Sequence, residues 1–331
     1  MSKRIITLGE VMMRLSTPGH ERFIQTHNYE VQFGGAEANV AASLAYWGQS
    51  VAHICAFPDH EIGRAGVRYL RSSNIDTSFV FLGKGRMGLY FFENGSMHRS
   101  SKIIYDRFDS AFSLFDGDQV DWKKVFAGAD WFHWTGITPA ISAPAAKLCL
   151  QAVKAAHEHG VKVSGDINYR RNLWQYGKTP IDVMPDLIQY TDVIIAGLTD
   201  FANCLDIQEK DFVTACEKAK LLFPQIQYVS TTHRDAVSST HNKLSGVLWN
   251  GNELIQGPTF DMPDIVDRVG GGDAFMAGLI FGLLNKADKD ALSFALAASV
   301  LKHSISGDAN FVTVEEVEHL VKGENVGKLL R

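Results

Sequence analysis

The chain has 331 residues, of which 46% are hydrophobic and 21% charged, and its formal net charge is -5. That balance is typical of a folded globular protein with one large α/β domain or two smaller ones, and it excludes an intrinsically disordered chain. The sequence has no long run of like charges, so we expect no nucleic-acid partner and no membrane-surface patch. Any anionic ligand must therefore be held by a few local groups.

The cysteines and the amino terminus indicate a cytoplasmic protein. The four cysteines lie far apart without C-x-x-C spacing, which predicts buried thiols in a reducing compartment rather than a zinc site or a disulfide framework. The first residues lack the apolar stretch of a signal peptide, and no apolar segment approaches the roughly 20 residues of a membrane span. We therefore expect no association with a membrane.

Apolar and amphipathic segments alternate from the amino terminus onward. A strand is expected at 4–10, a helix at 36–48, a strand at 50–57 and a helix at 61–73. This alternation predicts parallel βα units.

Between residues 74 and 108 the pattern changes. Alternating, aromatic-rich strands are separated by glycine turns, which predicts a small antiparallel sheet that forms a lid. The expected lid comprises residues 11–33 and 75–107. The expected α/β domain comprises residues 1–10, 34–74 and 108–331.

Strands and helices alternate again in the rest of the chain. Strands are expected at 161–168, 192–197 and 227–232, with helices between them, and two helices at 273–285 and 288–304 close the chain. Because no repeat or flexible linker interrupts this pattern, we expect one continuous α/β domain below the lid.

Three consecutive glycines, Gly270, Gly271 and Gly272, come directly before Asp273 and an apolar helix. Such a run costs backbone entropy and adds nothing to a core, so the bare backbone itself must be needed. In open α/β sheets, ligands bind where loops at the carboxyl ends of strands lead into helices. The glycine N–H groups and the positive end of the helix would form an anion hole for a phosphate.

Asp273 needs a function beside that phosphate, because a carboxylate repels it. The function that fits is general base, which accepts the proton of a substrate hydroxyl as the hydroxyl attacks the γ-phosphoryl group of ATP. The alternative is a helix cap. The sequence has neither a P-loop nor a G-x-G-x-x-G fingerprint, which disfavours a nicotinamide-dependent oxidoreductase.

Two separated segments carry a resemblance to a known family. Residues 33–48, FGGAEANVAASLAYWG, are similar to a G-G-x-x-x-N-x-A motif, and residues 267–283, DRVGGGDAFMAGLIFGL, to a D-T-x-G-A-G-D motif. The chain resembles the ribokinase-like (PfkB) carbohydrate kinases over essentially its whole length. This resemblance implies a three-layer α/β/α domain with a mostly parallel central sheet, a small β-sheet lid, and ATP with Mg²⁺. It leaves a monovalent-cation requirement open.

The same resemblance implies roles for individual residues. Asp273 would be the base beside the glycine anion hole, and Asp267, which matches the first aspartate of the second motif, would lie on the cofactor side. The residues that would contact the sugar are Gly34, Gly35 and Asn39.

The chain differs from the two motifs, and from a third motif of the family, at three places. Arg268 replaces the usual threonine and Gly271 the usual alanine, which changes side chains but keeps the backbone donors. The family's N-x-x-E, which is linked to Mg²⁺ and phosphate, appears here as Gly197 and Asp200. Asp200 is therefore the candidate for contact with the water shell of the metal.

Three arginines favour a sugar acid over a neutral sugar. Many sugar kinases of this family carry an aspartate in the segment after the first strand, and here that segment carries Arg14. Arg107 and Arg170 occur where the lid and the sheet would face the sugar, and an arginine fork binds a carboxylate bidentately. The alternative for each arginine is a solvated surface or an ion pair with an acid such as Asp106 or Asp166.

These segments, with Tyr90 and Tyr105, resemble the 2-keto-3-deoxygluconate kinases within the family. The resemblance implies that a sugar acid is held and phosphorylated by ATP to 2-keto-3-deoxy-6-phosphogluconate. The residues that would hold it are Gly34, Tyr90, Tyr105, Arg107 and Arg170. Core packing is the alternative for the two tyrosines, because they alternate with apolar residues.

Other functions stay open at this point. A fructokinase or another neutral-sugar or nucleoside kinase would share the fold, and a noncatalytic sugar-binding regulator would share it without the reaction. The choice between the gluconate-derived and galactonate-derived acids is also open. Because the lid has strand edges and aromatic residues such as Phe79, Phe81 and Phe91, we expect a homodimer or a larger assembly through the lid.

Overall fold

A computed structural model describes residues 2–324 of the chain. Within this part, ten strands form one large sheet, and in chain order they are β1 (Arg4–Leu8), β4 (Ser50–Pro58), β5 (Val80–Gly83), β8 (Trp131–Thr135), β9 (Lys162–Asp166), β10 (Val193–Ile195), β11 (Tyr228–Ala236), β12 (Asn242–Trp249), β13 (Leu254–Gln256) and β14 (Phe260–Met262). Their order across the sheet is β13-β12-β11-β10-β9-β8-β1-β4-β5, with β14 beside β12. The strands from β11 through β5 are parallel, and β12, β13 and β14 add antiparallel pairs. Parallel strands of this kind are covered on both faces, so the central residues of β1, β4 and β8 are buried.

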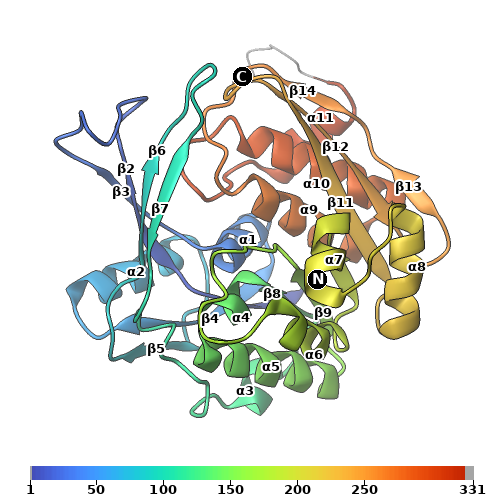
Figure 1. Cartoon of the computed structure of the whole chain (residues 1–331), viewed down its shortest axis with the longest axis horizontal. Helices are drawn as coiled ribbons and strands as arrows, with labels where there is room; N and C mark the ends of the chain where they lie inside the picture. Colours follow the sequence, from blue (N-terminus) through green and yellow to red (C-terminus); the bar gives the residue numbers. More distant parts are fainter. Residues whose placement is uncertain (1, 325–331) are drawn as a thin grey trace.

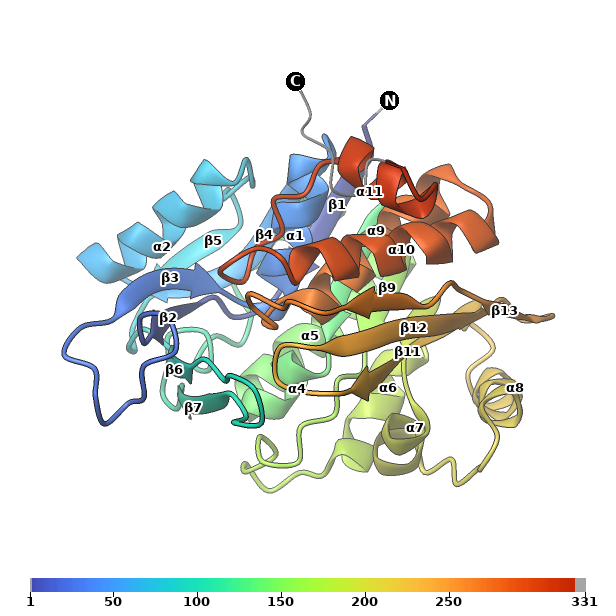
Figure 2. The ribbon, with the colours of Figure 1, turned by 90° about the horizontal axis from the view of Figure 1, so that it is seen from above.

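The helices cover both faces of this sheet. They are α1 (Ala36–Tyr46), α2 (Glu61–Ser72), α3 (Trp122–Phe126), α4 (Ile137–Ile141), α5 (Ala143–Glu158), a 3₁₀ turn (Pro180–Asp182), α6 (Met184–Ile188), α7 (Leu198–Leu205), α8 (Phe212–Leu222), α9 (Gly271–Asn285), α10 (Asp288–Lys302) and α11 (Val314–Val321). Figures 1 and 2 show α1, α9 and α10 on one side of the sheet and α5 and α6 on the other. The expected three-layer arrangement is confirmed.

Close packing against α10 explains two glycines within helix α9. A Cβ on Gly278 would lie 2.7 Å from the Cα of Ala295, and one on Gly282 would lie 2.6 Å from the Cα of Ala291. Both glycines therefore let α9 pack directly against the backbone of α10. This close packing fixes the amino terminus of α9, where the glycine run lies.

A second sheet within the described residues forms the lid. Its strands are β2 (Met12–Ser16), β3 (Glu30–Gly34), β6 (Leu89–Glu93) and β7 (Lys102–Asp106), in the order β3-β2-β6-β7. β2 pairs antiparallel with β3 but parallel with β6, so the expected all-antiparallel lid is wrong at this central pair. The outer strands expose Val31 and Ile104. Assembly through the lid stays a prediction.

One strand within the expected lid belongs to the large sheet instead. β5 lies inside the range 75–107, but it pairs parallel with β4, and its residues Val80 and Phe81 pack against the main core. The expected boundary at residue 75 therefore differs from the observed sheets, because an apolar edge strand gains more burial beside β4 than in the lid.

Most of the other expected elements agree with the structure. The closing helices occur at Gly271–Asn285 and Asp288–Lys302, and the four cysteines are free and buried. β11 continues to Ala236 rather than ending at residue 232, because it forms a long antiparallel ladder with β12. None of the helices within residues 2–324 is long and apolar enough to cross a membrane.

Candidate active site

A cavity of about 720 Å³ lies between the lid and the carboxyl ends of β9, β10 and β11. Its volume is within the range of small-molecule sites, roughly 300 to 1,000 Å³. Most of the expected site residues line it, from both the lid and the α/β domain: Gly34, Gly35, Asn39, Tyr90, Tyr105, Arg107, Arg170, Asp200, Gly270, Gly272 and Asp273. The cavity is where the two expected motifs meet.

The glycine run begins α9, and each glycine has a different surrounding. Gly270 is the N-cap with φ of 81°, and a Cβ there would lie 2.0 Å from the carbonyl oxygen of Asp308. A Cβ on Gly271 would strike the ring of His303 at 2.4 Å, whereas one on Gly272 would meet no atom of the described part of the chain within 4 Å. The fold therefore requires glycine at the first two positions. At Gly272 the bare backbone faces open space, as an anion hole needs.

A methyl group on Gly272 should impair activity without impairing the fold. We expect Gly272→Ala to change the free energy of unfolding by less than about 0.5 kcal/mol, since it meets no protein atom. A phosphate displaced by about 1 Å would lower kcat/KM by up to about 100-fold. Urea unfolding and ADP release measure the two effects. Gly270→Ala is the contrasting variant, because its strained φ predicts a loss of stability of at least about 1 kcal/mol. Full activity of Gly272→Ala would contradict the anion hole.

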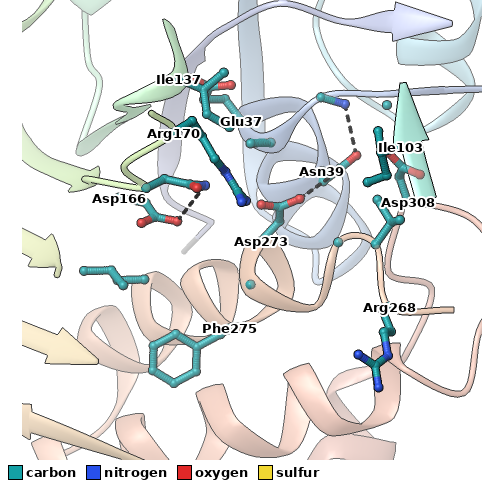
Figure 3. Close-up of a pocket in the computed structure, with 18 of the residues that line it drawn as sticks. Glu37, Asn39, Ile103, Ile137, Asp166, Arg170, Arg268, Asp273, Phe275 and Asp308 are labelled. Carbon is teal, nitrogen blue, oxygen red and sulfur yellow. Dashed lines mark hydrogen bonds between the residues drawn. The ribbon is translucent and has the colours of Figure 1, made fainter. Parts of the chain in front are cut away.

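Asp273 lies in the first turn of α9, partly buried, and faces the cavity. The side-chain amide of Asn39 donates to its Oδ2 at 2.7 Å (Figure 3). Among residues 2–324 no side chain caps α9, so the helix-cap alternative for Asp273 is not supported. Burial raises the pKa of Asp273 to about 7, the bond from Asn39 opposes that shift, and the charges of Asp308 and Glu37 add to it. A carboxyl with a pKa near 7 is suited to a general base at neutral pH.

The raised pKa predicts how the rate depends on pH. Below about pH 7 the Asp273 carboxyl of the free enzyme is protonated and cannot accept a proton, so kcat/KM should rise with pH through about 7 and then level off. The measurement is kcat/KM for phosphoryl transfer between pH 5 and 9. A rate that stays constant across pH 5 to 7.5 would show that Asp273 is not the titrating base.

Two more acids lie across the cavity from Asp273. Asp166 ends β9, and burial, followed by the charges of Asp200 and Asp273, raises its pKa to about 8 while Arg170 opposes the shift. Within the described residues no group of three potential ligands is arranged to hold a metal alone. Mg²⁺, however, is usually bound by one or two carboxylates together with phosphates and water. A cation would relieve the repulsion between these carboxylates, so the donor set fits Mg²⁺ that arrives with a nucleotide.

Asp200 has a structural function as well. Its Oδ2 accepts the backbone N–H of Gly197 at 2.8 Å, which caps α7, and its Oδ1 accepts the backbone N–H of Tyr169 at 3.1 Å. The expected metal contact of Asp200 therefore stays a proposal beside this cap. The sequence suggested Asp166 only as an ion-pair partner for an arginine, although its position at the carboxyl end of a strand is typical of a site residue.

Four arginines line the cavity, Arg107, Arg170, Arg234 and Arg268, and the two that were expected to contact the substrate, Arg107 and Arg170, differ in their partners. Arg170 is exposed, forms no side-chain hydrogen bond or ion pair within the described residues, and points toward Asp273 in Figure 3. Arg107 is buried, and its Nε donates to Oε2 of Glu10 at 2.8 Å. The pairing of Arg107 with Glu10, rather than with Asp106, holds its guanidinium at the cavity wall. Tyr105 is half exposed, with its ring centre 6.0 Å from the guanidinium carbon of Arg107.

Arg14 does not reach the cavity, and this differs from the expectation. Its side chain is 3% exposed and donates to Asp267 at 2.7 Å and to Asp308 at 2.6 Å. Because side chains alternate along β2, Arg14 shares the buried face of the strand with Met12, which does line the cavity, so its two internal ion pairs, and not the face it lies on, keep Arg14 from a ligand. Asp267 is buried with it, so its expected contact with the cofactor is likewise replaced by this internal ion pair.

Tyr90 joins the same buried network while it lines the cavity. Its hydroxyl donates to the carboxylate of Asp308, and the ring is 3% exposed. Lys302 is a further buried cation, whose Nζ donates to the carbonyl oxygen of Ile305 at 3.1 Å. A Cβ on Gly270 would lie 3.3 Å from the Cε of Lys302. Asp308 and Lys302 thus pack against the glycine loop at Gly270. No sequence motif indicated either residue.

Comparison with known proteins assigns the chain to a family. The model of the pfkB family of carbohydrate kinases matches residues 2–313. The chain belongs to this family. Kinases of the PfkB family use ATP.

Individual PfkB kinases are similar over nearly their full length. A 2-dehydro-3-deoxygalactonokinase of Haloferax volcanii is 30% identical over 99% of this chain and 99% of its own, and a 2-dehydro-3-deoxygluconokinase of Thermoproteus tenax is 28% identical over 96% and 94%. The crystal structure of a 2-dehydro-3-deoxygluconokinase from Thermotoga maritima superposes with a TM-score of 0.92 at 36% identity, covering 97% of this chain and all of that chain. These likenesses confirm the ribokinase-like α/β fold.

Proposed function

We propose that the protein transfers the γ-phosphoryl group of ATP to the terminal C6 hydroxyl of 2-keto-3-deoxygluconate, also called 2-dehydro-3-deoxygluconate. The observation that carries this proposal is the exposed Arg170, which lines the cavity, points toward Asp273 and forms no ion pair or side-chain hydrogen bond among the described residues. An arginine in this state is ready to pair with a substrate carboxylate. The names of the similar kinases from Haloferax, Thermoproteus and Thermotoga support a sugar acid of this class.

The chemistry follows from the positions of the charged groups. The ionised Asp273 accepts the proton of the hydroxyl while its oxygen bonds to the γ-phosphorus, and the bond from that phosphorus to the β-phosphate oxygen of ADP breaks. The backbone N–H groups of Gly270 and Gly272 stabilise the charge that develops on the phosphoryl oxygens. Gly271, the third glycine of the expected anion hole, does not line the cavity, and its N–H donates to the carbonyl oxygen of Arg268 at 3.4 Å. Mg²⁺ bound with ATP would be held by Asp166, with Asp200 near its water shell, and would neutralise phosphate charge.

The remaining cavity residues orient the sugar acid. Arg170 supplies positive charge for the carboxylate, whereas Arg107 is paired with Glu10 in the cavity wall, and Tyr90 and Tyr105 line the lid side of the same cavity. A Cβ on Gly34 would lie 2.1 Å from the carboxylate of Asp308 and one on Gly35 would lie 2.0 Å from the carbonyl oxygen of Glu10, so both glycines let the cavity wall pack closely, and Asn39 holds the base. Binding energy from the distant carboxylate is thus used to align the reacting hydroxyl.

Loss of Arg170 should remove the preference for the acid. We expect Arg170→Met to lower kcat/KM for 2-keto-3-deoxygluconate by roughly 10- to 100-fold, as for a lost charge-assisted hydrogen bond, and to change kcat/KM for fructose far less. Arg171→Met is the matched control, because Arg171 is also exposed but does not line the cavity. An unchanged ratio between acid and neutral sugar in Arg170→Met would refute the assignment.

The structure of the product tests the proposed reaction itself. Phosphorylation at C6 places the phosphate on a CH₂ group, so the ³¹P signal of the product should couple to two equivalent or near-equivalent protons. A phosphate on a ring carbon with one proton, or on the anomeric C2, would give a different coupling and would contradict transfer to the terminal hydroxyl. If none of the acceptors yields a phosphorylated product, a noncatalytic sugar-binding protein is favoured.

A further inference from the structure

Two turns meet over the cavity, one from each sheet. The lid turn, residues 94–101, joins β6 to β7, and the β11–β12 turn comprises residues 237–241 of the α/β domain. The backbone N–H of Ser239 donates to the carbonyl oxygen of Met97 at 2.7 Å, and its hydroxyl donates to that of Arg99 at 2.7 Å. Figures 1 and 2 both show the tip of the β6–β7 hairpin beside the β11–β12 hairpin. Ser239 therefore fastens the far end of the lid to the main domain.

Arg268 holds the β11–β12 turn from the opposite side. Its Nε donates to the carbonyl oxygen of Ser239 at 2.9 Å, and its Nη2 donates to that of Ser238 at 2.7 Å. Within residues 2–324 it forms no ion pair with a carboxylate, and in Figure 3 its side chain runs away from Asp273. The guanidinium thus serves as a planar fork for two successive carbonyl groups.

The position of Arg268 connects this fork to the phosphate site. Arg268 lies two residues before Gly270, the N-cap of α9, and the intervening Val269 also lines the cavity. A short side chain such as threonine, which the second motif usually carries here, ends too close to the backbone to reach two carbonyl groups of a neighbouring hairpin. The lid turn, the β11–β12 turn and the anion hole are consequently joined through one side chain.

We propose that Arg268 is a positioning residue that couples docking of the lid to the geometry of the anion hole. This inference rests on the proposed kinase function. When the lid turn docks on Ser239, the Ser238 and Ser239 carbonyl groups are fixed against Arg268, and the backbone that continues into residues 269–272 is fixed with them. Docking of the lid over the sugar therefore orders the N–H groups that receive the phosphate, and it excludes water from the same cavity.

Amide hydrogen exchange tests the coupling independently of activity. In Arg268→Met, which keeps length but has no donors, we expect exchange in the lid turn and in residues 237–241 to accelerate by at least about tenfold, because local opening becomes easier. Exchange in α2 should stay unchanged. Arg64→Met is the matched control, since Arg64 is an exposed arginine of α2 paired with Asp59 at 2.6 Å. Unchanged exchange at both turns would overturn the proposal.

Kinetics show whether the coupling affects the reaction. We expect Arg268→Met to lower kcat by roughly 10- to 100-fold with little change in KM for the sugar acid, and to raise the share of ATP hydrolysed to ADP and phosphate without sugar phosphorylation. Arg268→Lys, which donates to fewer carbonyl groups, should restore part of both effects. A variant with faster exchange but unchanged kcat and unchanged hydrolysis would overturn the link to the anion hole.

A milder variant covers the case in which Arg268→Met does not fold. Ser239→Ala removes only the hydroxyl bond to Arg99, and its control is Ser293→Ala, whose hydroxyl bonds the carbonyl group of Lys289 on α10. We expect faster exchange in the lid turn for Ser239→Ala alone, and no difference between the two serine variants would count against the proposal. If the wild type shows no kinase activity while the exchange results hold, the proposed function fails and the connection between the two turns stands.

Discussion

Asp273→Asn should abolish phosphoryl transfer while the protein stays folded. The substitution keeps the shape of the side chain, and its oxygen can still accept the hydrogen bond from Asn39 that holds Asp273 at 2.7 Å. The amide cannot accept the proton of the attacking hydroxyl, so we expect kcat to fall by about 10²- to 10⁴-fold, the usual contribution of a general base. Stability should not fall, because a partly buried charge is removed rather than created. ADP release and urea unfolding measure the two effects.

The control for this variant is a carboxylate outside the cavity. Asp290→Asn changes an exposed aspartate in the first turn of α10 that does not line the site, and it should keep full activity. If Asp273→Asn kept kcat within about tenfold of the wild type, the residue would be at most a minor contributor and another base would be required.

Arg14→Met should destabilise the fold strongly. Arg14 is the shared partner of two buried carboxylates, Asp267 and Asp308, in the ion network below the cavity. Removal of one partner from a buried ion pair leaves charge without compensation, which costs about 3 to 5 kcal/mol of the free energy of unfolding. Arg64→Met, at an exposed ion pair, should cost no more than about 1 kcal/mol.

The loss in Arg14→Met should also depend on pH. Burial already raises the pKa of Asp308, and the charge of Arg14 opposes that shift. Without Arg14 the folded variant would hold more protons than the unfolded chain, so its stability should fall further as pH rises from 5 to 8 relative to the wild type. Urea unfolding at several pH values measures this. A small loss that is independent of pH would show that the network contributes little.

The elements that the sequence predicted well are those with local signals. Apolar strands alternating with helices predicted the parallel sheet, and the glycine run before Asp273 predicted the cavity at the amino terminus of α9. A glycine run that adds nothing to the core indicates that the bare backbone is needed at that place. The lid was predicted as a separate sheet, but the parallel β2–β6 pair was not, because residue patterns do not report which distant strand is the neighbour.

The charged network could not be predicted for the same reason. Arg14 and Asp267 are 253 residues apart in the chain, and Arg107 and Glu10 are 97 apart. Nothing in a single sequence distinguishes an arginine that meets a substrate from one that meets a distant acid. Arg170, by contrast, lies in the loop that follows the carboxyl end of β9 at Asp166, and it lines the cavity as expected.

The most direct test of the central claim is the choice of phosphoryl acceptor. ADP release from Mg·ATP should be compared for 2-keto-3-deoxygluconate, fructose, ribose and adenosine with the wild-type protein. We expect kcat/KM for the keto acid to exceed that for each neutral acceptor by about 100-fold or more, because Arg170 would lack its carboxylate partner in the others. Faster turnover of fructose, ribose or adenosine would contradict a sugar-acid kinase and would leave a neutral-substrate kinase of the same family.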